Sequence, residues 1–461
     1  MQGFPHVFVT GDSIGGVGMS SFRRSRVAVV AIGTVAVALA LSGVSGAATA
    51  GPDQGVTDKA IKIGFLYSKT GVAASTSGSS DIGCKARIGR QNAAGGVSGR
   101  KLEVEYVDDL SSAANMTQAQ SLVQNEHVYM IINDSAFAFL SYRWLLDHDV
   151  PLIGGGFDGN YYGAPGNEKV ISAFGNSPPI SGIQTTLTPK IMKFLGASKI
   201  AGIGYGVSPS SSAAVKSLQQ YAVPALGLEP VYTNTSVDFG TSDVGPLVLG
   251  MKNAGADGAW YAMDLSTNLA LAQGLIQNGV KMKAQLMATG YGHELLDQPV
   301  SKTLGPDIVF MTGWAPVELK TKATKRFQAD LKKYAGFTGV PDFGIYTGYI
   351  DCDLAILGLK KQGKDLDPTT FADSLRSVGT YNAGGGLGCS NSSQSLETYG
   401  KIVVGDESNG RRICTWALQV KDGKFVVLKP KDSDTTYWTG DLIEESVDPQ
   451  YLVTTTTGAK K

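Results

Sequence analysis

The chain has 461 residues, of which 43% are apolar, so it is long enough for two or three domains and too apolar for a disordered protein. Lysine plus arginine and aspartate plus glutamate number 40 each, and this balance gives no electrostatic reason to expect a nucleic-acid partner. Glycine, at 59 residues, exceeds its roughly 7% average, which is typical of chains with many tight turns or with backbone close to a ligand.

The N-terminal segment has the order of an export signal. A basic stretch (residues 23–26) precedes an apolar run (27–41), and small residues ending in Ala-Thr-Ala (48–50) follow. This is the order of n-region, h-region and cleavage site in secretory signal peptides. We therefore expect residues 1–50 to be a signal peptide, with Met19 as an alternative start. A membrane anchor is less favoured, because the apolar run is shorter than the ~20 residues that span a bilayer.

From Ile61 onward, short β-rich segments alternate with longer amphipathic ones. The strand candidates are 61–67, 102–107, 128–132, 151–153, 170–174, 199–204, 229–233, 258–262, 285–288 and 307–311. The helix candidates between them include 112–126, 179–195, 209–225, 242–254 and 267–278. Strands separated by helices of this length predict βαβ units and parallel sheets. Because the pattern restarts near residue 175, we expect two doubly wound Rossmann-like α/β lobes.

After residue 311 the alternation becomes looser. The sequence predicts helices over 321–334, 346–362 and 368–377, followed by a β-hairpin (413–420 and 424–428) around the turn Asp422-Gly423. Residues 431–461 are polar and rich in threonine, and we expect them to form a loosely docked tail.

The four cysteines lie in the exported part of the chain, at positions 84, 352, 389 and 414. An even number in an oxidising compartment predicts two disulfides, with three connectivities open. Cys389 and Cys414 bracket a short stretch, so we expect Cys389–Cys414 and Cys84–Cys352. Metal binding is the rival interpretation, but C-x-x-C spacing is absent from the sequence and its four histidines include no i, i+4 pair.

Several segments, taken together, resemble a known family. The most specific is Asn-Ala-Ala-Gly-Gly-Val-Ser-Gly-Arg (92–100) before a strand, and the acidic pair Asp108-Asp109 follows that strand. Val150–Ile153, Gly290-Tyr291-Gly292 and 346–363 continue the series. Over residues 57–428 the chain resembles the branched-chain amino acid (Leu/Ile/Val) binding proteins of ABC transporters, which have the type I periplasmic-binding fold.

This resemblance implies two lobes joined by a hinge, with lobe 1 formed by residues 58–174 and 305–377 and lobe 2 by 175–304 and 378–430. It implies that a small molecule binds between the lobes, that the lobes close on it, and that a membrane permease of an ABC importer receives it. The resemblance also implies a monomer, exported to the periplasm or cell envelope of a bacterium. A ligand-sensing or a structural cell-envelope protein on the same fold remains the alternative.

The resemblance places ligand-binding candidates in two loops of lobe 1, which are Asp134, Ser135, Ala136, Gly155, Gly156 and Phe157. The first loop leaves a strand and starts a helix, where unpaired N–H groups favour a bound carboxylate. Ser135 is the leading contact, and a simple N-cap is its alternative role. The second loop offers backbone N–H groups and an aromatic ring, with a tight turn as the alternative.

In lobe 2 the candidates are Tyr205, Asp264 and Tyr291. Asp264 matches the region where the amino acid binders place an acid for the ligand ammonium, and helix capping is its alternative role. Surface packing is the alternative for Tyr291. Because lobe 1 has glycine and aromatic substitutions and lobe 2 offers no certain acid, we expect an aromatic acid, an amide or another carboxylate rather than a leucine-like ligand.

An enzyme needs a reaction centre, and the sequence does not provide a recognisable one. Gly96–Arg100 breaks the G-x-S-x-G pattern at its last position, and His293-Glu294 lacks the second histidine of H-E-x-x-H. Gly202–Gly206 fails the spacing of a dinucleotide fingerprint. We therefore expect a binding protein that is not an enzyme and has no cofactor, metal or nucleic-acid partner.

Overall fold

The structure is a computed structural model, and it describes residues 54–154, 167–172, 183–389, 394–395, 402–404, 412–431, 433–447 and 452–454. The predicted signal peptide (1–50) and the candidates Gly155, Gly156 and Phe157 lie outside these residues. None of the described helices combines the length and apolar character that a bilayer span requires.

The first sheet is entirely parallel, with the strand order β2-β1-β3-β4-β5. Its strands are β1 (Ala60–Tyr67), β2 (Lys101–Asp108), β3 (Met130–Asp134), β4 (Leu152–Gly154) and β5 (Val170–Ile171). The helices of this half are α1 (Ala74–Ser77), α2 (Ser80–Ala93), α3 (Ala114–Gln124), α4 (Tyr142–Asp147), α11 (Lys322–Ala335), α12 (Phe343–Gln362), α13 (Phe371–Arg376) and α14 (Ala383–Gly386). The first five predicted strands therefore pair in one parallel sheet, as expected.

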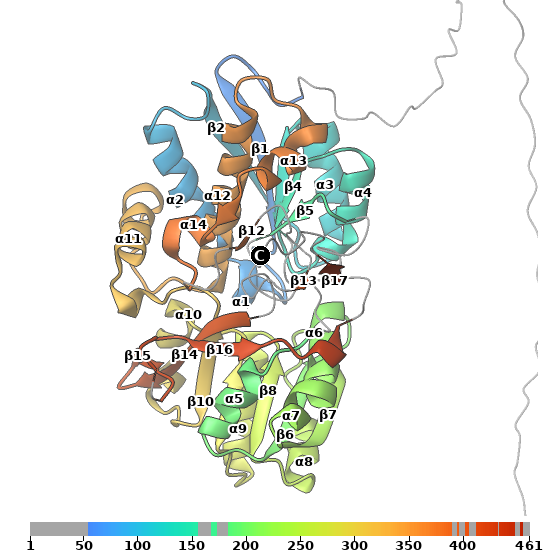
Figure 1. Cartoon of the computed structure of the whole chain (residues 1–461), viewed down its shortest axis with the longest axis vertical. Helices are drawn as coiled ribbons and strands as arrows, with labels where there is room; N and C mark the ends of the chain where they lie inside the picture. Colours follow the sequence, from blue (N-terminus) through green and yellow to red (C-terminus); the bar gives the residue numbers. More distant parts are fainter. Residues whose placement is uncertain are drawn as a thin grey trace, which may run out of the picture. The chain divides into compact units, whose positions relative to one another are not determined.

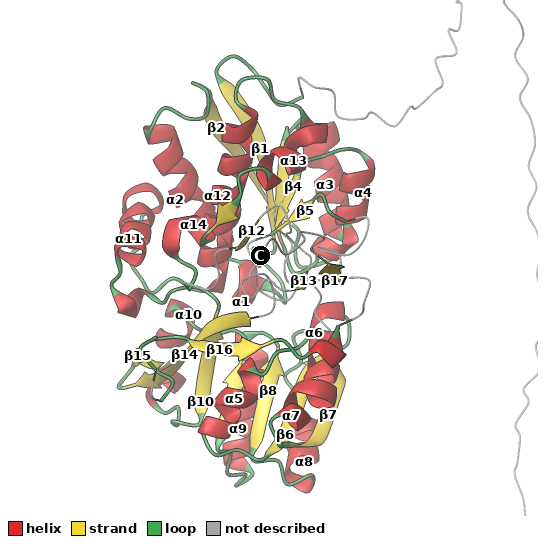
Figure 2. Cartoon of the chain, viewed as in Figure 1, coloured by secondary structure: helices red, strands yellow, loops and turns green. Residues whose placement is uncertain are grey.

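The second sheet has eight strands, in the order β15-β14-β10-β9-β8-β6-β7 with β16 paired to β14. Its strands are β6 (Lys199–Tyr205), β7 (Glu229–Val237), β8 (Gly258–Ala262), β9 (Ala284–Met287), β10 (Ile308–Thr312), β14 (Arg412–Lys421), β15 (Lys424–Leu428) and β16 (Trp438–Asp441). Its helices are α5 (Leu187–Phe194), α6 (Pro209–Ser217), α7 (Val223–Ala225), α8 (Gly245–Asn253), α9 (Leu265–Gln277) and α10 (His293–Leu296). Figures 1 and 2 show the first sheet with its helices in the upper half of the view and the second in the lower half.

Shorter elements complete the described chain. Two small sheets pair β11 (Thr380–Tyr381) with β12 (Gln394–Ser395) and β13 (Ile402–Val404) with β17 (Leu452–Thr454). The short helical turns are η1 (Ala138–Leu140), η3 (Leu218–Ala222), η4 (Pro299–Lys302), η5 (Val317–Leu319), η6 (Pro368–Thr370) and η8 (Glu444–Ser446).

Both sheets repeat one strand order. In the first, β1 lies between β2 and β3, and in the second, β6 lies between β7 and β8. In each sheet the second strand pairs on one side of the first strand, and the third strand pairs on its other side. The direction in which strands are added therefore reverses between β1 and β3, and again between β6 and β8. In open α/β sheets, a crevice for ligands opens at the carboxyl ends of the strands at such a reversal point. The fold therefore points to two specific places for the binding residues.

The sequence predicted one helix over 209–225, whereas the structure has three pieces. Helix α6 begins after the N-cap Ser208, whose hydroxyl accepts a hydrogen bond from the Ser211 N–H, and Pro209 occupies the first helical position. It then widens into the π-helical turn η3 before the short helix α7. Pro224 explains the interruption, because it has no N–H and its ring clashes with the carbonyl four residues earlier.

Helices α2 and α12 pack closely against each other beside the first sheet. A Cβ atom on Gly83 would lie 2.0 Å from the Ile345 carbonyl oxygen, and one on Gly348 would lie 1.9 Å from the Ser80 carbonyl oxygen. Glycine at both positions thus lets the two helix backbones approach. The buried pair Arg87–Asp353, at 2.5 Å, also links the two helices.

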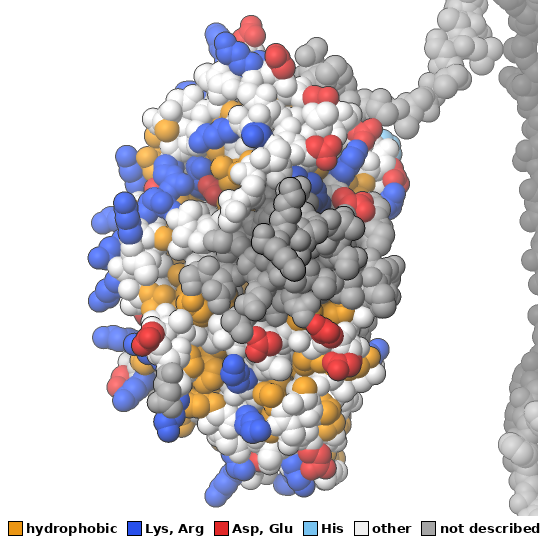
Figure 3. Space-filling view, viewed as in Figure 1, with side chains coloured by type: hydrophobic (Ala, Val, Ile, Leu, Met, Phe, Trp, Pro, Cys, Tyr) orange, Lys and Arg blue, Asp and Glu red, His pale blue; other side chains and the backbone are white. Residues whose placement is uncertain are grey.

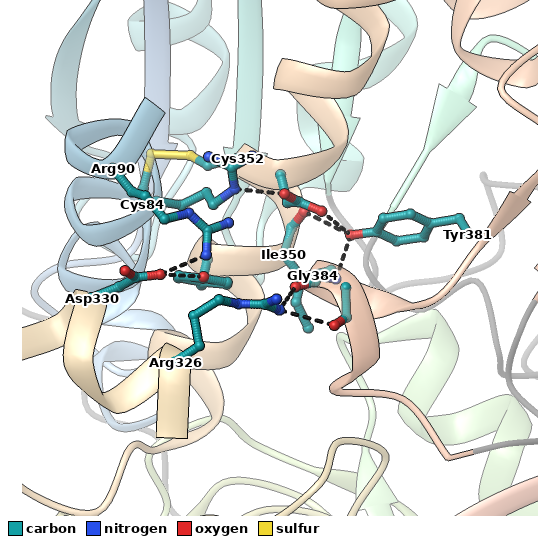
Figure 4. Close-up of polar contacts among 12 residues, drawn as sticks. Cys84, Arg90, Arg326, Asp330, Ile350, Cys352, Tyr381 and Gly384 are labelled. Atoms are coloured by element: carbon teal, nitrogen blue, oxygen red, sulfur yellow. Dashed lines mark hydrogen bonds and ion pairs between the residues drawn. A yellow bond between two sulfur atoms is a disulfide. The ribbon is translucent and has the colours of Figure 1, made fainter. Parts of the chain in front are cut away.

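Both predicted disulfides, Cys84–Cys352 and Cys389–Cys414, are confirmed. The first joins α2 to α12, and Figure 4 shows it beside the pair formed by Arg90 and Asp330.

The chain passes between the two sheets after Ser172, after β10 and after α14. The lobe boundaries remain predictions, but two elements lie in a different place from the expected one. Residues 378–430 were expected in lobe 2, whereas α14 packs on α12 of the first half. Residues 305–377 were assigned to lobe 1, whereas β10 pairs with β9 and β14 of the second sheet. The apolar residues of β10 other than Met311 are buried in that sheet, so the crossing follows β10 instead of preceding it.

The expectation of a loosely docked C-terminal tail is wrong for residues 438–447. Strand β16 pairs with β14, and Trp438 is buried, with its indole N–H donating to the Leu428 carbonyl at 2.7 Å. Ile443 and Val447 are buried as well. Composition misled the prediction because a few large apolar side chains within a polar segment are enough to anchor it.

Candidate functional site

Ser68 and Ser135 meet where the strand order of the first sheet reverses. Ser68 follows β1 and Ser135 follows β3, and their hydroxyl oxygens lie 3.0 Å apart. The Ser135 hydroxyl donates to Asp109 and accepts from the Phe137 N–H at 2.9 Å. Ser135 is 1% exposed. Its hydroxyl therefore serves a buried network and the following turn. Ser135 is not the N-cap that the alternative predicted, because Phe137 occupies the N-cap position of η1, and ligand contact by Ser135 stays a prediction.

Asp134 and Ala136 flank Ser135 and are also buried. The Thr347 hydroxyl of α12 donates to the Asp134 carboxylate at 2.7 Å. Burial raises the pKa of Asp134 to about 7, against the lowering effect of this hydrogen bond. Asp134 thus holds α12 against the end of β3, and its role toward a ligand stays a prediction.

Tyr205 and Asp264 meet at the reversal point of the second sheet. Tyr205 ends β6 and Asp264 follows β8, and the Tyr205 hydroxyl donates to the Asp264 carboxylate. Asp264 is also the N-cap of α9, since its carboxylate accepts from the Ser266 and Thr267 N–H groups. Burial raises the pKa of Tyr205, so its phenol stays protonated as a donor. The structure therefore gives Asp264 the expected capping role.

Tyr291 follows β9 and is 3% exposed, so it does not lie on the surface. Its hydroxyl donates to Glu318 at 2.8 Å and accepts from the Val317 N–H at 2.9 Å. Its ring lies 6.3 Å from that of Tyr346 on α12. Tyr291 therefore connects the end of β9 to the chain segment that crosses back to the first half.

Aromatic side chains connect the two reversal points, a feature that the sequence analysis missed. Phe137 follows β3 of the first sheet and Phe239 follows β7 of the second, and their ring centroids are 5.9 Å apart. Phe239 also stacks on Tyr205 at 3.9 Å. Both phenylalanines are only partly buried. A loop phenylalanine carries no local sequence signal for such a contact, because the partner belongs to the other half of the chain.

A pocket lies beside these contacts and is lined from both halves. Its described lining is Ser75, Leu265, Thr289, Gly290, Tyr291, Gly292, Glu294, Asp342 and Phe343. Ser75 of the first half also lies near the second, with its hydroxyl oxygen 3.5 Å from an Asp264 carboxylate oxygen. The pocket leaves only ≈ 10 Å³ for the centre of a water-sized sphere, which is about what one water molecule requires.

Two acids, Glu294 and Asp342, line this pocket. Asp342 is the N-cap of α12, where it accepts from the Ser79 hydroxyl at 2.5 Å, and Glu294 lies on α10. Burial, and next the nearby Asp342, raise the pKa of Glu294 to about 8, and burial also raises the pKa of Asp342. His293 Nδ1 lies 3.4 Å from Asp342 Oδ2 without a hydrogen bond. In the sequence, Glu294 stands out only as part of an incomplete metalloprotease motif.

Across the described ranges, no three or more His, Cys, Asp or Glu side chains are grouped so that they could hold a metal ion. The polar groups of the two reversal points are engaged with one another and with backbone N–H groups. What the arrangement provides is a pair of opposed, partly aromatic surfaces with hydroxyl and carboxyl groups at their edges.

The chain is similar to known proteins. A Brucella abortus (strain 2308) protein named Leu/Ile/Val-binding protein homolog 7 is 25% identical over 393 residues, which cover 80% of this chain and 91% of the relative. A fatty acid ABC transporter substrate-binding protein from Thermomonospora curvata has a TM-score of 0.67 at 19% identity, over 81% of this chain and 92% of its own. The substrate-binding protein LivJ from Streptococcus pneumoniae, in complex with isoleucine, has a TM-score of 0.63 at 18% identity, over 81% and 100% of the two chains.

These likenesses confirm the fold and the family resemblance that the sequence indicated. The sequence pattern of the periplasmic binding protein family matches residues 60–424, which include both sheets up to the first residue of β15 and every described candidate residue. This chain belongs to the periplasmic binding protein family.

Proposed function

We propose that this protein captures a small metabolite with a carboxylate and an apolar body, outside the cytoplasm, and passes it unchanged to the membrane permease of an ABC importer. The two solved relatives support this ligand class. One is described as a fatty acid transporter protein and the other holds isoleucine, and both kinds of molecule join a carboxylate to an apolar chain.

The contact between Phe137 and Phe239 carries the proposal. Each ring lies beside the reversal point of its own sheet, and together they present apolar surface from both halves. An apolar ligand body inserted between them would gain the burial that now comes from the direct contact, at roughly 25 cal/mol per Å² of apolar surface. Each phenylalanine would then pack against the ligand instead of against the phenylalanine of the other half.

The carboxylate would be held by hydroxyl and backbone N–H donors. The described lining of the pocket contains no lysine or arginine. Ser75 supplies a hydroxyl whose contact with Asp264, at 3.5 Å, is long. Hydrogen bonds to a carboxylate are stronger than those between neutral groups, so a few such donors suffice. We propose that Asp134, Ser135 and Ala136, with the predicted loop 155–157, form the wall of the first half.

Access to this space needs movement of the two halves. The pocket as it stands has room for about one water molecule, so a metabolite enters only after the halves move apart. The chain segments that pass between the sheets are the natural hinges, and closure around the ligand would be the state that the importer recognises.

Thermal unfolding in the presence of a ligand panel tests this proposal. The panel contains branched-chain amino acids, aromatic acids, fatty acids and their amides. A ligand at 100 times its Kd stabilises the folded state by about 2.7 kcal/mol, and we expect at least one carboxylate to do so. The variant Phe239→Ala is expected to weaken that response at least tenfold, whereas Phe194→Ala, at an exposed position of the same half, should leave it unchanged. The proposal fails if no carboxylate stabilises the protein or if a compound of the panel is chemically converted.

A further inference from the structure

Helix α11 (Lys322–Ala335) exposes a stripe of lysines. Lys322, Lys325, Lys332 and Lys333 are exposed, and at 100° per residue they fall within an arc of about 100° on one side of the helix. The opposite side buries Phe327 and Leu331. The helix therefore turns an apolar side to the core and a cationic side to the solvent.

The acid that could neutralise the stripe is directed away from it. Asp330 is the only acidic residue in α11, and it is buried, where it pairs with Arg90 at 2.7 Å and accepts from the Tyr349 hydroxyl at 2.7 Å. Within the described residues, none of the four lysines of the stripe forms an ion pair.

The basic surface continues onto neighbouring elements. Lys360, Lys361 and Lys364 are exposed at the end of α12, and this end lies against the turn after α2, since the Ser98 hydroxyl donates to the Gly363 carbonyl. Figure 3 shows lysine and arginine side chains gathered along the left margin of this face, where α2 and α11 lie in Figure 1.

Helix stability explains only part of this charge. Lys332 and Lys333 lie in the last turn of α11, where cations interact favourably with the helix dipole. Lys322 is in the first turn, Lys325 follows it closely and Lys320 precedes the N-cap, and the first turn contains no acid. Cations there oppose the dipole. Their presence therefore suggests a use outside the fold.

We infer that this lysine surface binds the anionic headgroups of the membrane that holds the importer. The stripe extends over eleven residue steps of a helix, or about 16 Å, which suits a surface of many phosphates rather than one ligand. Lysine acts as a hydrated point charge without the bidentate geometry that arginine offers to a specific partner. The surface also belongs to one half of the molecule, so it can act whether the halves are open or closed.

Co-sedimentation of the full-length protein with vesicles tests this inference. Vesicles of phosphatidylglycerol and phosphatidylcholine are compared with phosphatidylcholine alone, in 20 mM and in 500 mM NaCl. We expect binding to the anionic vesicles only, and its loss at high salt because the charges are screened. A lysine near an anionic surface contributes about fivefold in partitioning, which corresponds to about 1 kcal/mol.

The triple variant Lys322→Gln, Lys325→Gln, Lys332→Gln is therefore expected to bind on the order of 100-fold more weakly. The matched control is Lys216→Gln, Lys281→Gln, Lys302→Gln, which removes three exposed lysines from the second half and should bind like the unchanged protein. Equal loss in both variants, or no loss in either, would overturn the inference.

Two further outcomes separate the alternatives. If the unchanged protein binds vesicles only when they contain the importer, the partner is an acidic protein surface and the lipid inference is wrong. Thermal unfolding of both triple variants should match that of the unchanged protein, because no side chain of these six lysines forms an ion pair with the described residues. A failure of ligand capture, tested separately, leaves this result unaffected.

Discussion

The phenol of Tyr205 donates a hydrogen bond to the carboxylate of Asp264, and this pair closes the end of the second sheet where the strand order reverses. The same carboxylate caps α9 through the N–H groups of Ser266 and Thr267. Asp264 thus connects two strands and a helix at one buried point. Its contribution to stability can be measured separately from any role in ligand binding.

Replacing Asp264 by alanine removes the cap and leaves the buried Tyr205 hydroxyl without its acceptor. We expect a loss of about 2–3 kcal/mol in the free energy of unfolding, measured by urea denaturation. Asp264→Asn keeps a good capping side chain, so its loss should stay near 1 kcal/mol or below. Equal destabilisation by both variants would contradict the capping role. A selective loss of ligand affinity in Asp264→Asn would instead indicate contact between the carboxylate and the ligand.

The two disulfides close loops of very different length, with sequence separations of 268 for Cys84–Cys352 and 25 for Cys389–Cys414. A cross-link stabilises the folded state mainly by limiting the conformations of the unfolded chain. Removing the disulfide of the longer loop should therefore lower the free energy of unfolding by about 5 kcal/mol, and removing that of the shorter loop should lower it by about 3 kcal/mol. Paired serine variants, compared by denaturant unfolding with and without a reducing agent, check this order. A variant that lacks all four cysteines should not respond to the reducing agent. If the agent destabilises that variant further, its effect comes from something other than the disulfides.

Gly348 sets the spacing between α2 and α12. A Cβ atom there would lie 1.9 Å from the Ser80 carbonyl oxygen, so Gly348→Ala must push the helices apart. We expect a destabilisation of at least about 2 kcal/mol, although alanine is intrinsically the better helix former. Gly313→Ala is the matched control, since no atom lies within 4 Å of a Cβ at that position. Thermal unfolding of both variants measures the difference, and a neutral Gly348→Ala would refute the close packing.

Glu294 should make stability depend on pH. Its folded pKa is about 8, above the roughly 4.3 of a free glutamate, so between these values the folded state binds more protons than the unfolded state. Stability therefore falls as pH rises from about 4 to about 8. Because the side chain is partly exposed, we expect a contribution of about 1–2 kcal/mol, reduced by solvent screening.

Glu294→Gln should flatten this dependence, raising the melting temperature at pH 9 and changing it little at pH 5. The comparison is with Asp297→Asn, an exposed acid just after the same helix. Melting curves at pH 5, 7 and 9 check the expectation. An unchanged slope in Glu294→Gln would show that the pH dependence of stability arises from other groups.

The sequence predicted the parallel strands, the β-hairpin and both disulfides. The strands and the hairpin were predictable because they depend on local patterns. Periodicity identifies strands and helices, and a turn such as Asp422-Gly423 sets its own hairpin. The cysteine pairs followed from their number and separation. The interruption of the helix at Pro224 was also within reach, since proline disrupts a helix wherever it occurs within one.

The candidate site was only partly predictable. Tyr205 and Asp264 follow strands, which made them candidates, and the structure shows that they bind each other. Asp264 has the capping role that the sequence offered as its alternative, while ligand contact by either residue stays a prediction. Phe137 and Phe239 were not named, and neither was Asp342. Their contacts join segments that are far apart in the chain, and no local pattern records which distant side chain will be the neighbour.

By itself, then, the sequence determined most of the segments that become strands and helices and the parallel strands of two sheets, and it favoured the cysteine pairing that the structure shows. Only the tertiary structure decided that β10 belongs to the second sheet, that residues 438–447 dock on β14, and that Phe137 meets Phe239. The physical reason is that the hydrogen bonds of helices and turns and the side-chain periodicity depend on residues close in the chain, whereas burial depends on which distant surfaces come together.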